Sequence, residues 1–100
     1  MTEFDVLKVA GNAGRAGITT AFIMKSSDGT PGGALTLLGT AAVVPNEGAI
    51  RNLAGEFAFS VHVPHGAISA KQIVVLDNHG NQIKPRTVTI DTAANTMAVR

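Results

Sequence analysis

The residues best suited to chemistry in this 100-residue chain are its three histidines. His62 and His65 lie three positions apart on either side of Pro64, and His79 lies further along in an Asn-His-Gly run. Two imidazoles at this spacing could bind zinc together with a third ligand. However, the chain has no Cys, and the loop after Pro64 holds no Asp or Glu, so the spacing matches no zinc motif. We therefore expect no metal site.

A Ser–His–Asp triad is the second chemistry that the composition allows. The candidate residues beside the histidines are Ser60, Ser69, Asp77 and Asp91. No Gly-x-Ser-x-Gly run marks either serine as a nucleophile. The two aspartates fall in predicted turns, where Asp is favoured because its carboxylate bonds the local backbone. The composition therefore predicts that the chain is not an enzyme and needs no cofactor.

Phosphate, nucleic-acid and membrane binding also lack support in the sequence. The Gly-rich stretch 26–33 is not followed by Lys-Ser or Lys-Thr or by a helix, as a phosphate loop would be. The formal charge is only +1, and there is no Trp or Tyr to stack on bases. No unbroken apolar run exceeds four residues, whereas a membrane span needs about 20. An acidic N-terminus without an apolar segment predicts synthesis in the cytoplasm.

The stretch 55–64 is the clearest structural element, because its residue types alternate strictly. Such alternation places two sets of side chains on opposite faces of one strand. The apolar set is Phe57, Phe59, Val61 and Val63, and the other set is Glu56, Ala58, Ser60 and His62. We expect the second set to face water or a partner. The predicted core consists of Phe57, Phe59, Val61, Leu76, Val88 and Ile90.

Short strands separated by turn residues account for most of the remaining chain. The expected strands are 18–25, 34–44, 72–76, 81–84, 87–90 and 96–99, with turns at 26–33, 77–80 and 91–95. Gly39 predicts a bulge or bend within its strand. One short helix is expected from Asn46 to Leu53, closed by Gly55. The pattern predicts an all-β fold of about seven short strands, either an antiparallel β-sandwich, which includes an immunoglobulin-like arrangement, or a partly open barrel.

The sequence divides into a flexible N-terminal arm, residues 1–17, and a single β domain, residues 18–100. Three glycines between Gly11 and Gly17 predict the flexibility, although Val6 to Val9 could form a short strand. Only 15% of the residues are charged and 45% are hydrophobic, which indicates surface that a partner covers. The residues expected to bind that partner are Phe4, Val6, Leu7 and Ile68. On this interpretation, deleting residues 1–12 leaves the domain folded and abolishes binding.

Three stretches resemble the small decoration, or cement, proteins of tailed-phage heads. They are the Gly/Ala-rich apolar stretch 33–43, the Gly-x-Phe strand 55–59 and the hairpin 73–81. The resemblance implies a structural protein on the outer capsid surface of a virion. Its partners would be the major capsid protein and neighbouring copies of itself, in a homo-oligomer. Lambda-type decoration proteins form trimers, and other phage cement proteins are immunoglobulin-like. The alternative is an immunoglobulin-like accessory module of a phage tail, baseplate or adhesin.

Overall fold

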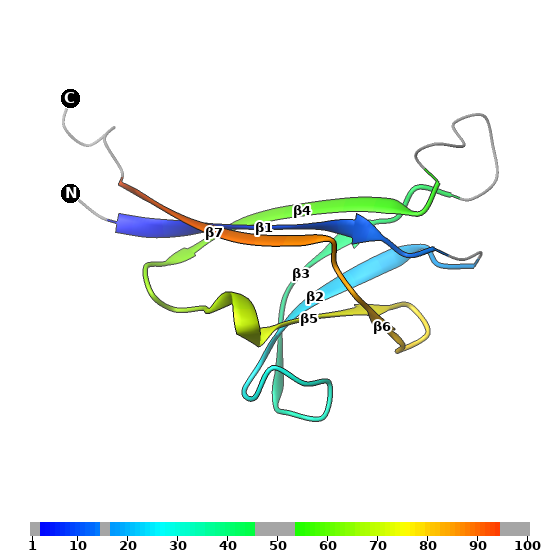
Figure 1. Cartoon of the computed structure of the whole chain (residues 1–100), viewed down its shortest axis with the longest axis horizontal. Coiled ribbons are helices and arrows are strands. Elements are labelled where there is room, and N and C mark those ends of the chain that lie inside the picture. Colours follow the sequence, from blue (N-terminus) through cyan, green and yellow to red (C-terminus); the bar gives the residue numbers. More distant parts are fainter. Residues whose placement is uncertain (1–2, 15–16, 46–53, 95–100) are drawn as a thin grey trace.

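Two antiparallel sheets, packed face to face, form the molecule (Figure 1). The computed structural model describes residues 3–14, 17–45 and 54–94. One sheet has the strand order β4-β1-β7 and the other has the order β3-β2-β5-β6. The strands are β1 (Glu3–Asn12), β2 (Thr20–Ser26), β3 (Leu35–Ala42), β4 (Glu56–Pro64), β5 (Ile73–Asp77), β6 (Gln82–Ile83) and β7 (Thr87–Ala94). The predicted all-β fold is confirmed, and of the two arrangements it is the sandwich.

Hairpins join β2 to β3 and β5 to β6, and each of the other connections crosses between the sheets. The second hairpin turns where the sequence predicted. The Asp77 carboxylate accepts hydrogen bonds from the N–H groups of His79 (2.8 Å) and Asn81 (2.9 Å). Gly80 adopts a φ of 82°, which favours glycine. Local chemistry therefore fixes this turn.

The predicted core is confirmed with one exception. Phe57 is only 4% exposed, and the side chains of Phe59, Val61, Val88 and Ile90 pack against the buried cluster. Leu76 was expected in this core and lies outside it. Its neighbour Val75 is fully buried between the sheets, so the alternation of the strand turns Leu76 to the opposite face of β5.

The flexible arm predicted for residues 1–17 is wrong over Glu3–Asn12. This segment is β1, the central strand of the three-stranded sheet, and it pairs with both β4 and β7. Leu7 and Val9 are 0% and 1% exposed. Gly11 does not start a loop: a Cβ there would lie 3.1 Å from Cζ of Phe57, so the glycine makes room for that ring. Residues 3–12 thus belong to the same sandwich as the β domain.

The bulge predicted near Gly39 is confirmed. Ile23 lies opposite Gly39, whereas Met24 lies opposite Leu37, so Leu38 is the extra residue. The turn expected at 91–95 is wrong for residues 91–94, which continue β7. A 3-10 turn, η2 (Ala70–Gln72), precedes β5, and Ser69 caps it. The helix expected at 46–53 and the strand expected at 96–99 lie outside the described residues.

An immunoglobulin-like strand order is not confirmed. The first strand of the immunoglobulin fold lies at the edge of its sheet. In this chain β1 lies between β4 and β7. The fold is accordingly described only as a small antiparallel β-sandwich.

Candidate interaction surfaces

The four residues predicted to bind a partner lie in two different environments. Phe4 and Val6 are half-buried and point to the outer face of the three-stranded sheet, since their neighbours Asp5 and Leu7 point inward. Leu7 (0% exposed) and Ile68 (8% exposed) belong to the core, so the prediction that they contact a partner is wrong. Leu7 was predicted to bind a partner because residues 1–17 were expected to form a flexible arm.

The outer face of the three-stranded sheet mixes small and polar side chains with the apolar Phe4 and Val6. The set expected to face water or a partner, Glu56, Ala58, Ser60 and His62, lies on it opposite residues of β1. A shallow open depression of about 390 Å³ is lined mainly by small side chains such as Ala10, Ala58, Ser60 and Thr87. At one end the His62 ring stacks on Phe4 at 4.8 Å. The depression is open to solvent and does not form an enclosed pocket.

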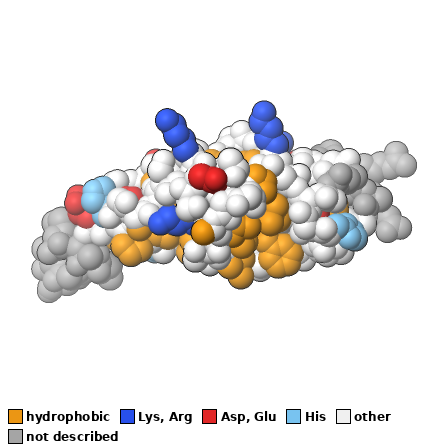
Figure 2. All heavy atoms as spheres, turned by 90° about the horizontal axis from the view of Figure 1, so that it is seen from below, with side chains coloured by type: hydrophobic (Ala, Val, Ile, Leu, Met, Phe, Trp, Pro, Cys, Tyr) orange, Lys and Arg blue, Asp and Glu red, His pale blue; other side chains and the backbone are white. Residues whose placement is uncertain are grey.

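The outer face of the four-stranded sheet is apolar, although the opposite face of the same sheet already packs on the core. We define the outer apolar face by its five members: Phe22, Met24, Leu37, Val74 and Leu76. Phe22 lies opposite Leu76 in the sheet, and Met24 lies opposite both Val74 and Leu37. Val74 is 1% exposed and Leu37 is 53% exposed. Figure 2, seen from the side of this sheet, shows hydrophobic side chains gathered there.

Sequence reasoning missed the outer apolar face, although a signal was present. The unbroken run Ile73–Leu76 places apolar residues on both faces of β5. Such runs are typical of strands that are covered on both sides. An antiparallel sheet with one solvated face shows alternation instead, as β4 does. The run therefore agrees with a strand that has apolar side chains on both of its faces.

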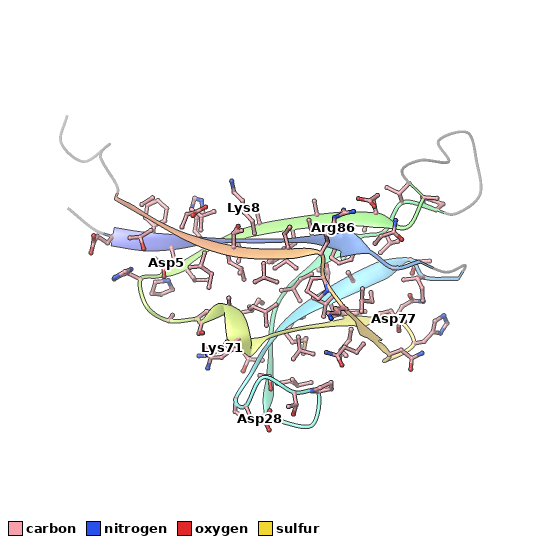
Figure 3. The ribbon with its side chains drawn as sticks, viewed as in Figure 1. Asp5, Lys8, Asp28, Lys71, Asp77 and Arg86 are labelled. Atoms are coloured by element: carbon pink, nitrogen blue, oxygen red, sulfur yellow. The ribbon has the colours of Figure 1, made fainter. Side chains whose placement is uncertain are left out.

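A second candidate site joins three segments around a buried carboxylate. Asp5, on β1, is 3% exposed. It accepts hydrogen bonds from the hydroxyl of Thr92 on β7 (2.9 Å) and from the N–H of Gly66 (3.0 Å), and its Oδ1 lies 2.9 Å from Nδ1 of His65. His65 is exposed, with a side-chain exposure of 52%. Figure 3 shows Asp5 toward one end of the sandwich and Asp77 toward the other.

The Asp5 cluster does not have the geometry of a catalytic triad. In a triad the carboxylate bonds Nδ1 of the histidine, and the hydroxyl lies at Nε2. Here the Thr92 hydroxyl lies 3.5 Å from Nδ1 of His65 and bonds the same carboxylate. The hydroxyl and the carboxylate thus lie on one side of the imidazole, and the cluster ties β7 and the turn after β4 to β1.

The serine and aspartate candidates for a triad lie apart from this cluster. Ser60 faces outward on β4 opposite Lys8, and Asp91 faces outward on β7 opposite Val6. Ser69 caps η2, and Asp77 caps the β5–β6 turn. Each of these side chains has a place on the outer surface or a local structural role.

The charges of the Asp5 cluster predict a pH-dependent stability. The hydrogen bond with His65, followed by that from Gly66, holds the pKa of Asp5 below its usual value. The same bond with Asp5 raises the pKa of His65, with a smaller contribution from Glu3. The histidine's stabilisation is complete below pH about 6.5 and is lost as the pH rises through the raised pKa. The stabilisation that the Asp5 carboxylate provides is complete above pH about 3.9 and is lost as the pH falls through the lowered pKa of Asp5.

Replacing His65→Gln should therefore lower the melting temperature most between pH about 4 and 6.5. The difference from the wild-type protein should narrow as the pH rises toward 9, because wild-type His65 loses its charge. Thermal unfolding followed by circular dichroism at pH 5 and pH 9 measures both differences. An equal difference at the two pH values would show that the charge of His65 does not contribute.

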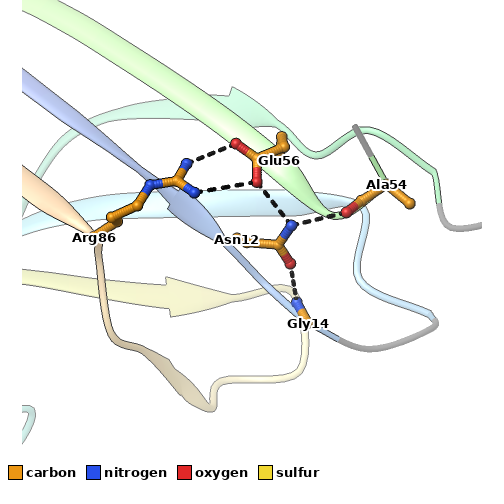
Figure 4. A network of polar contacts seen from close by, with 5 residues as sticks. All are labelled: Asn12, Gly14, Ala54, Glu56 and Arg86. Carbon is orange, nitrogen blue, oxygen red and sulfur yellow. Dashed lines mark hydrogen bonds and ion pairs between the residues drawn. The ribbon is translucent and has the colours of Figure 1, made fainter. Parts of the chain in front are cut away.

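A network of polar contacts joins the strands of the three-stranded sheet at the end away from Asp5 (Figure 4). Arg86 Nη2 donates to Glu56 Oε1 at 2.6 Å, and Asn12 donates to the other carboxylate oxygen at 2.8 Å. Asn12 also donates to the carbonyl of Ala54 and accepts from the N–H of Gly14. The ion pair with Arg86 lowers the pKa of Glu56. These contacts hold the ends of β1 and β4 and the start of β7 together, which is a structural role.

Within residues 3–14, 17–45 and 54–94 no group of three or more His, Asp or Glu side chains could hold a metal ion. The same part of the chain contains no helix that is long and apolar enough to cross a membrane. No protein-family model matches the chain, and no curated protein or solved structure shows significant similarity to it.

Proposed function

We propose that this protein is a non-enzymatic structural subunit of a virus particle that decorates and stabilises the outer surface of a tailed-phage capsid. The observation that carries the proposal is the outer apolar face, which gives the four-stranded sheet hydrophobic side chains on both sides. A sheet of this kind is expected to be covered on both sides. The major capsid protein is the proposed cover.

The two outer faces suggest how the subunit would sit on the capsid. The four-stranded sheet presents Leu37, 53% exposed, together with the half-buried Phe22, Met24 and Leu76. The outer face of the three-stranded sheet presents mostly small and polar side chains, with Phe4 and Val6 half-buried at one end, and Lys8 extends from it away from the body of the molecule (Figure 3). Burial of apolar surface drives protein association, so the four-stranded sheet should face the capsid and the three-stranded sheet should face solvent.

The resemblance to decoration proteins supports the same surface. Leu37 lies in the Gly/Ala-rich stretch 33–43, and Val74 and Leu76 lie in the hairpin stretch 73–81. Two of the three stretches that resemble those proteins thus supply members of the outer apolar face. The low fraction of charged residues, 15%, is also consistent with a surface that is covered in the working assembly.

The number of copies in purified particles tests the proposal. Particles from the strain that carries the coding sequence are purified and their protein ratios measured by quantitative mass spectrometry. A fixed ratio to the major capsid protein, set by the capsid lattice, is the expected result. A copy number at the level of tail proteins would replace the proposal with the tail, baseplate or adhesin module. Absence from the particles would overturn both.

A pair of surface variants tests the proposed face. Leu37→Glu places a charge in the outer apolar face, where the capsid would have to desolvate it, and should reduce binding to undecorated capsids at least tenfold, an effect of about 1.4 kcal/mol or more. Ala58→Glu places the same charge on the exposed outer face of the three-stranded sheet and serves as the control. Co-sedimentation with capsids measures both. Equal binding by Leu37→Glu and the wild-type protein would exclude this face as the contact.

A further inference from the structure

The edge formed by β7 is open along the described part of the chain. β7 pairs with β1 on one side, and no described strand pairs with its other side. An open edge presents a row of unpaired backbone groups that can pair with another chain. Natural proteins protect such edges with lysine, proline, bulges or very short strands. The eight residues of β7 contain one charged residue, Asp91, but no Lys, Arg, Pro or Gly, and their register with β1 is continuous.

The inward side chains along this edge are incompletely covered. Val88 and Ile90 pack against the core and are only half-buried. The elements of the facing side are short: β6 has two residues (Gln82–Ile83), and η2, which lies close to β7, has three (Ala70–Gln72), so they cannot cover the whole length of β7. The edge thus combines unpaired backbone groups with the half-buried side chains of Val88 and Ile90. One additional strand would form hydrogen bonds with the backbone groups and cover the side chains.

We propose that this strand is β7 of a second copy, paired antiparallel about a two-fold axis at Thr89. The two three-stranded sheets would then form one sheet with the order β4-β1-β7-β7-β1-β4. The inference does not depend on the capsid proposal, because the outer apolar face that carries that proposal belongs to the other sheet.

The side chains of β7 select the register. Directly opposed residues of two antiparallel strands lie on the same face of the sheet. The two-fold axis must therefore relate a residue to the same residue of the second copy, because an axis between two neighbouring residues would pair an inward with an outward side chain. An axis at Asp91 would oppose two like charges, which is unfavourable. With the axis at Thr89, Val88 of each copy lies opposite Ile90 of the other copy. Asp91 of each copy lies opposite Thr87 of the other copy. This register gives two apolar cross-strand pairs and no charge conflict.

The dimer should be weak in solution. One pair of strands buries much less than the roughly 1,200 Å² of a stable interface. Copies held side by side on a larger assembly would pair more readily, because their effective concentration is higher. The purified protein should therefore show a concentration-dependent equilibrium between monomer and dimer, which analytical ultracentrifugation measures.

Single cysteines test the register, since the natural chain has no Cys. Thr89 and Thr87 are both exposed and lie on the same face of β7. At the proposed axis the two Cα atoms of residue 89 lie about 5 Å apart, within disulfide range. The two copies of residue 87 are four positions apart, about 13 Å along the strands. Thr89→Cys should form a disulfide-linked dimer on mild oxidation, and Thr87→Cys, the matched control, should not.

Opposite charges provide an independent test. Thr89→Lys and Thr89→Glu should each be at least tenfold weaker in self-association, because like charges meet at the axis. An equimolar mixture of the two should restore association. Thr36→Lys, exposed on β3 of the other sheet, is the control and should associate as the wild type does. Circular dichroism confirms that each variant is folded.

Three outcomes would overturn the inference. A wild-type chain that stays monomeric up to millimolar concentration would show that no copy occupies this edge. Equal cross-linking by Thr87→Cys and Thr89→Cys would refute the register. Association that the mixture of charged variants does not restore would indicate a different contact, such as β4 of one copy with β7 of another. The copy number in particles is unaffected by these results, so the two proposals fail separately.

Discussion

A chain that lacks residues 1–12 is expected to be unfolded. The deletion removes β1, the central strand of the three-stranded sheet, and with it the pairing of both β4 and β7. It also removes Leu7 and Val9, which are almost completely buried. Losing two such side chains alone should cost several kcal/mol, against a total stability of about 5–15 kcal/mol for a small domain. The far-ultraviolet circular dichroism of the truncated chain should show no cooperative thermal transition.

Two neighbouring point variants separate a structural strand from a binding arm. Leu7→Ala should lower the free energy of unfolding by about 2–5 kcal/mol, because its side chain is fully buried. Val6→Ala, one residue earlier on the outer face, should cost about 1 kcal/mol or less. Urea titration measures both values. If the truncated chain melted cooperatively, or if the two variants had equal effects, residues 1–12 would be a flexible arm and not a structural strand.

Local sequence patterns predicted the elements that local chemistry determines. The strand β4 followed from the alternation of Phe57, Phe59, Val61 and Val63 with smaller or polar residues. The β5–β6 turn followed from the residues 77–80, which form it with their own side chains and backbone. In both cases the decisive interactions lie within a few positions, so the sequence alone contains them.

The strand β1 escaped prediction because its inward positions are not all hydrophobic. The inward residues are Asp5, Leu7, Val9 and Gly11, so a charge and a glycine stand where the pattern requires apolar side chains. Asp5 is tolerated because His65, Gly66 and Thr92 satisfy it from segments that are 60 or more positions away. A local pattern cannot show partners at this distance.

The candidate surfaces were only partly predictable for a similar reason. The sequence indicated that apolar surface would be covered, but it assigned Leu7 and Ile68 to that surface and Leu76 to the core. Deciding between the two faces of β5 requires knowing which face meets the other sheet. That information comes from the pair Ile23 and Val75, which is buried in the core and so leaves Leu76 and Val74 on the outer face. The open edge of β7 likewise depends on strand order, which alternation does not determine.

The contact between Gly39 and Phe59 joins the two sheets and gives the last prediction. A Cβ at position 39 would lie 2.5 Å from Cε1 and 2.7 Å from Cζ of the Phe59 ring. Real Cβ atoms do not approach so closely, so Gly39→Ala must displace the ring from its place between β3 and β4. Overpacking of this kind typically costs about 1–3 kcal/mol. Phe59→Ala should also be strongly destabilising, with up to about 3 kcal/mol lost, since the ring is half-buried against the core.

A second substitution should partly rescue Gly39→Ala. Phe59→Leu removes the two ring atoms that the new methyl group would meet, and leaves a branched side chain to fill the remaining space. The double variant should therefore be more stable than the sum of the single effects predicts, by about 0.5–3 kcal/mol, as expected for residues in direct contact. Chemical unfolding of the wild-type protein, the two single variants and the double variant gives this coupling energy. Additive effects would mean that the ring does not occupy the space above Gly39.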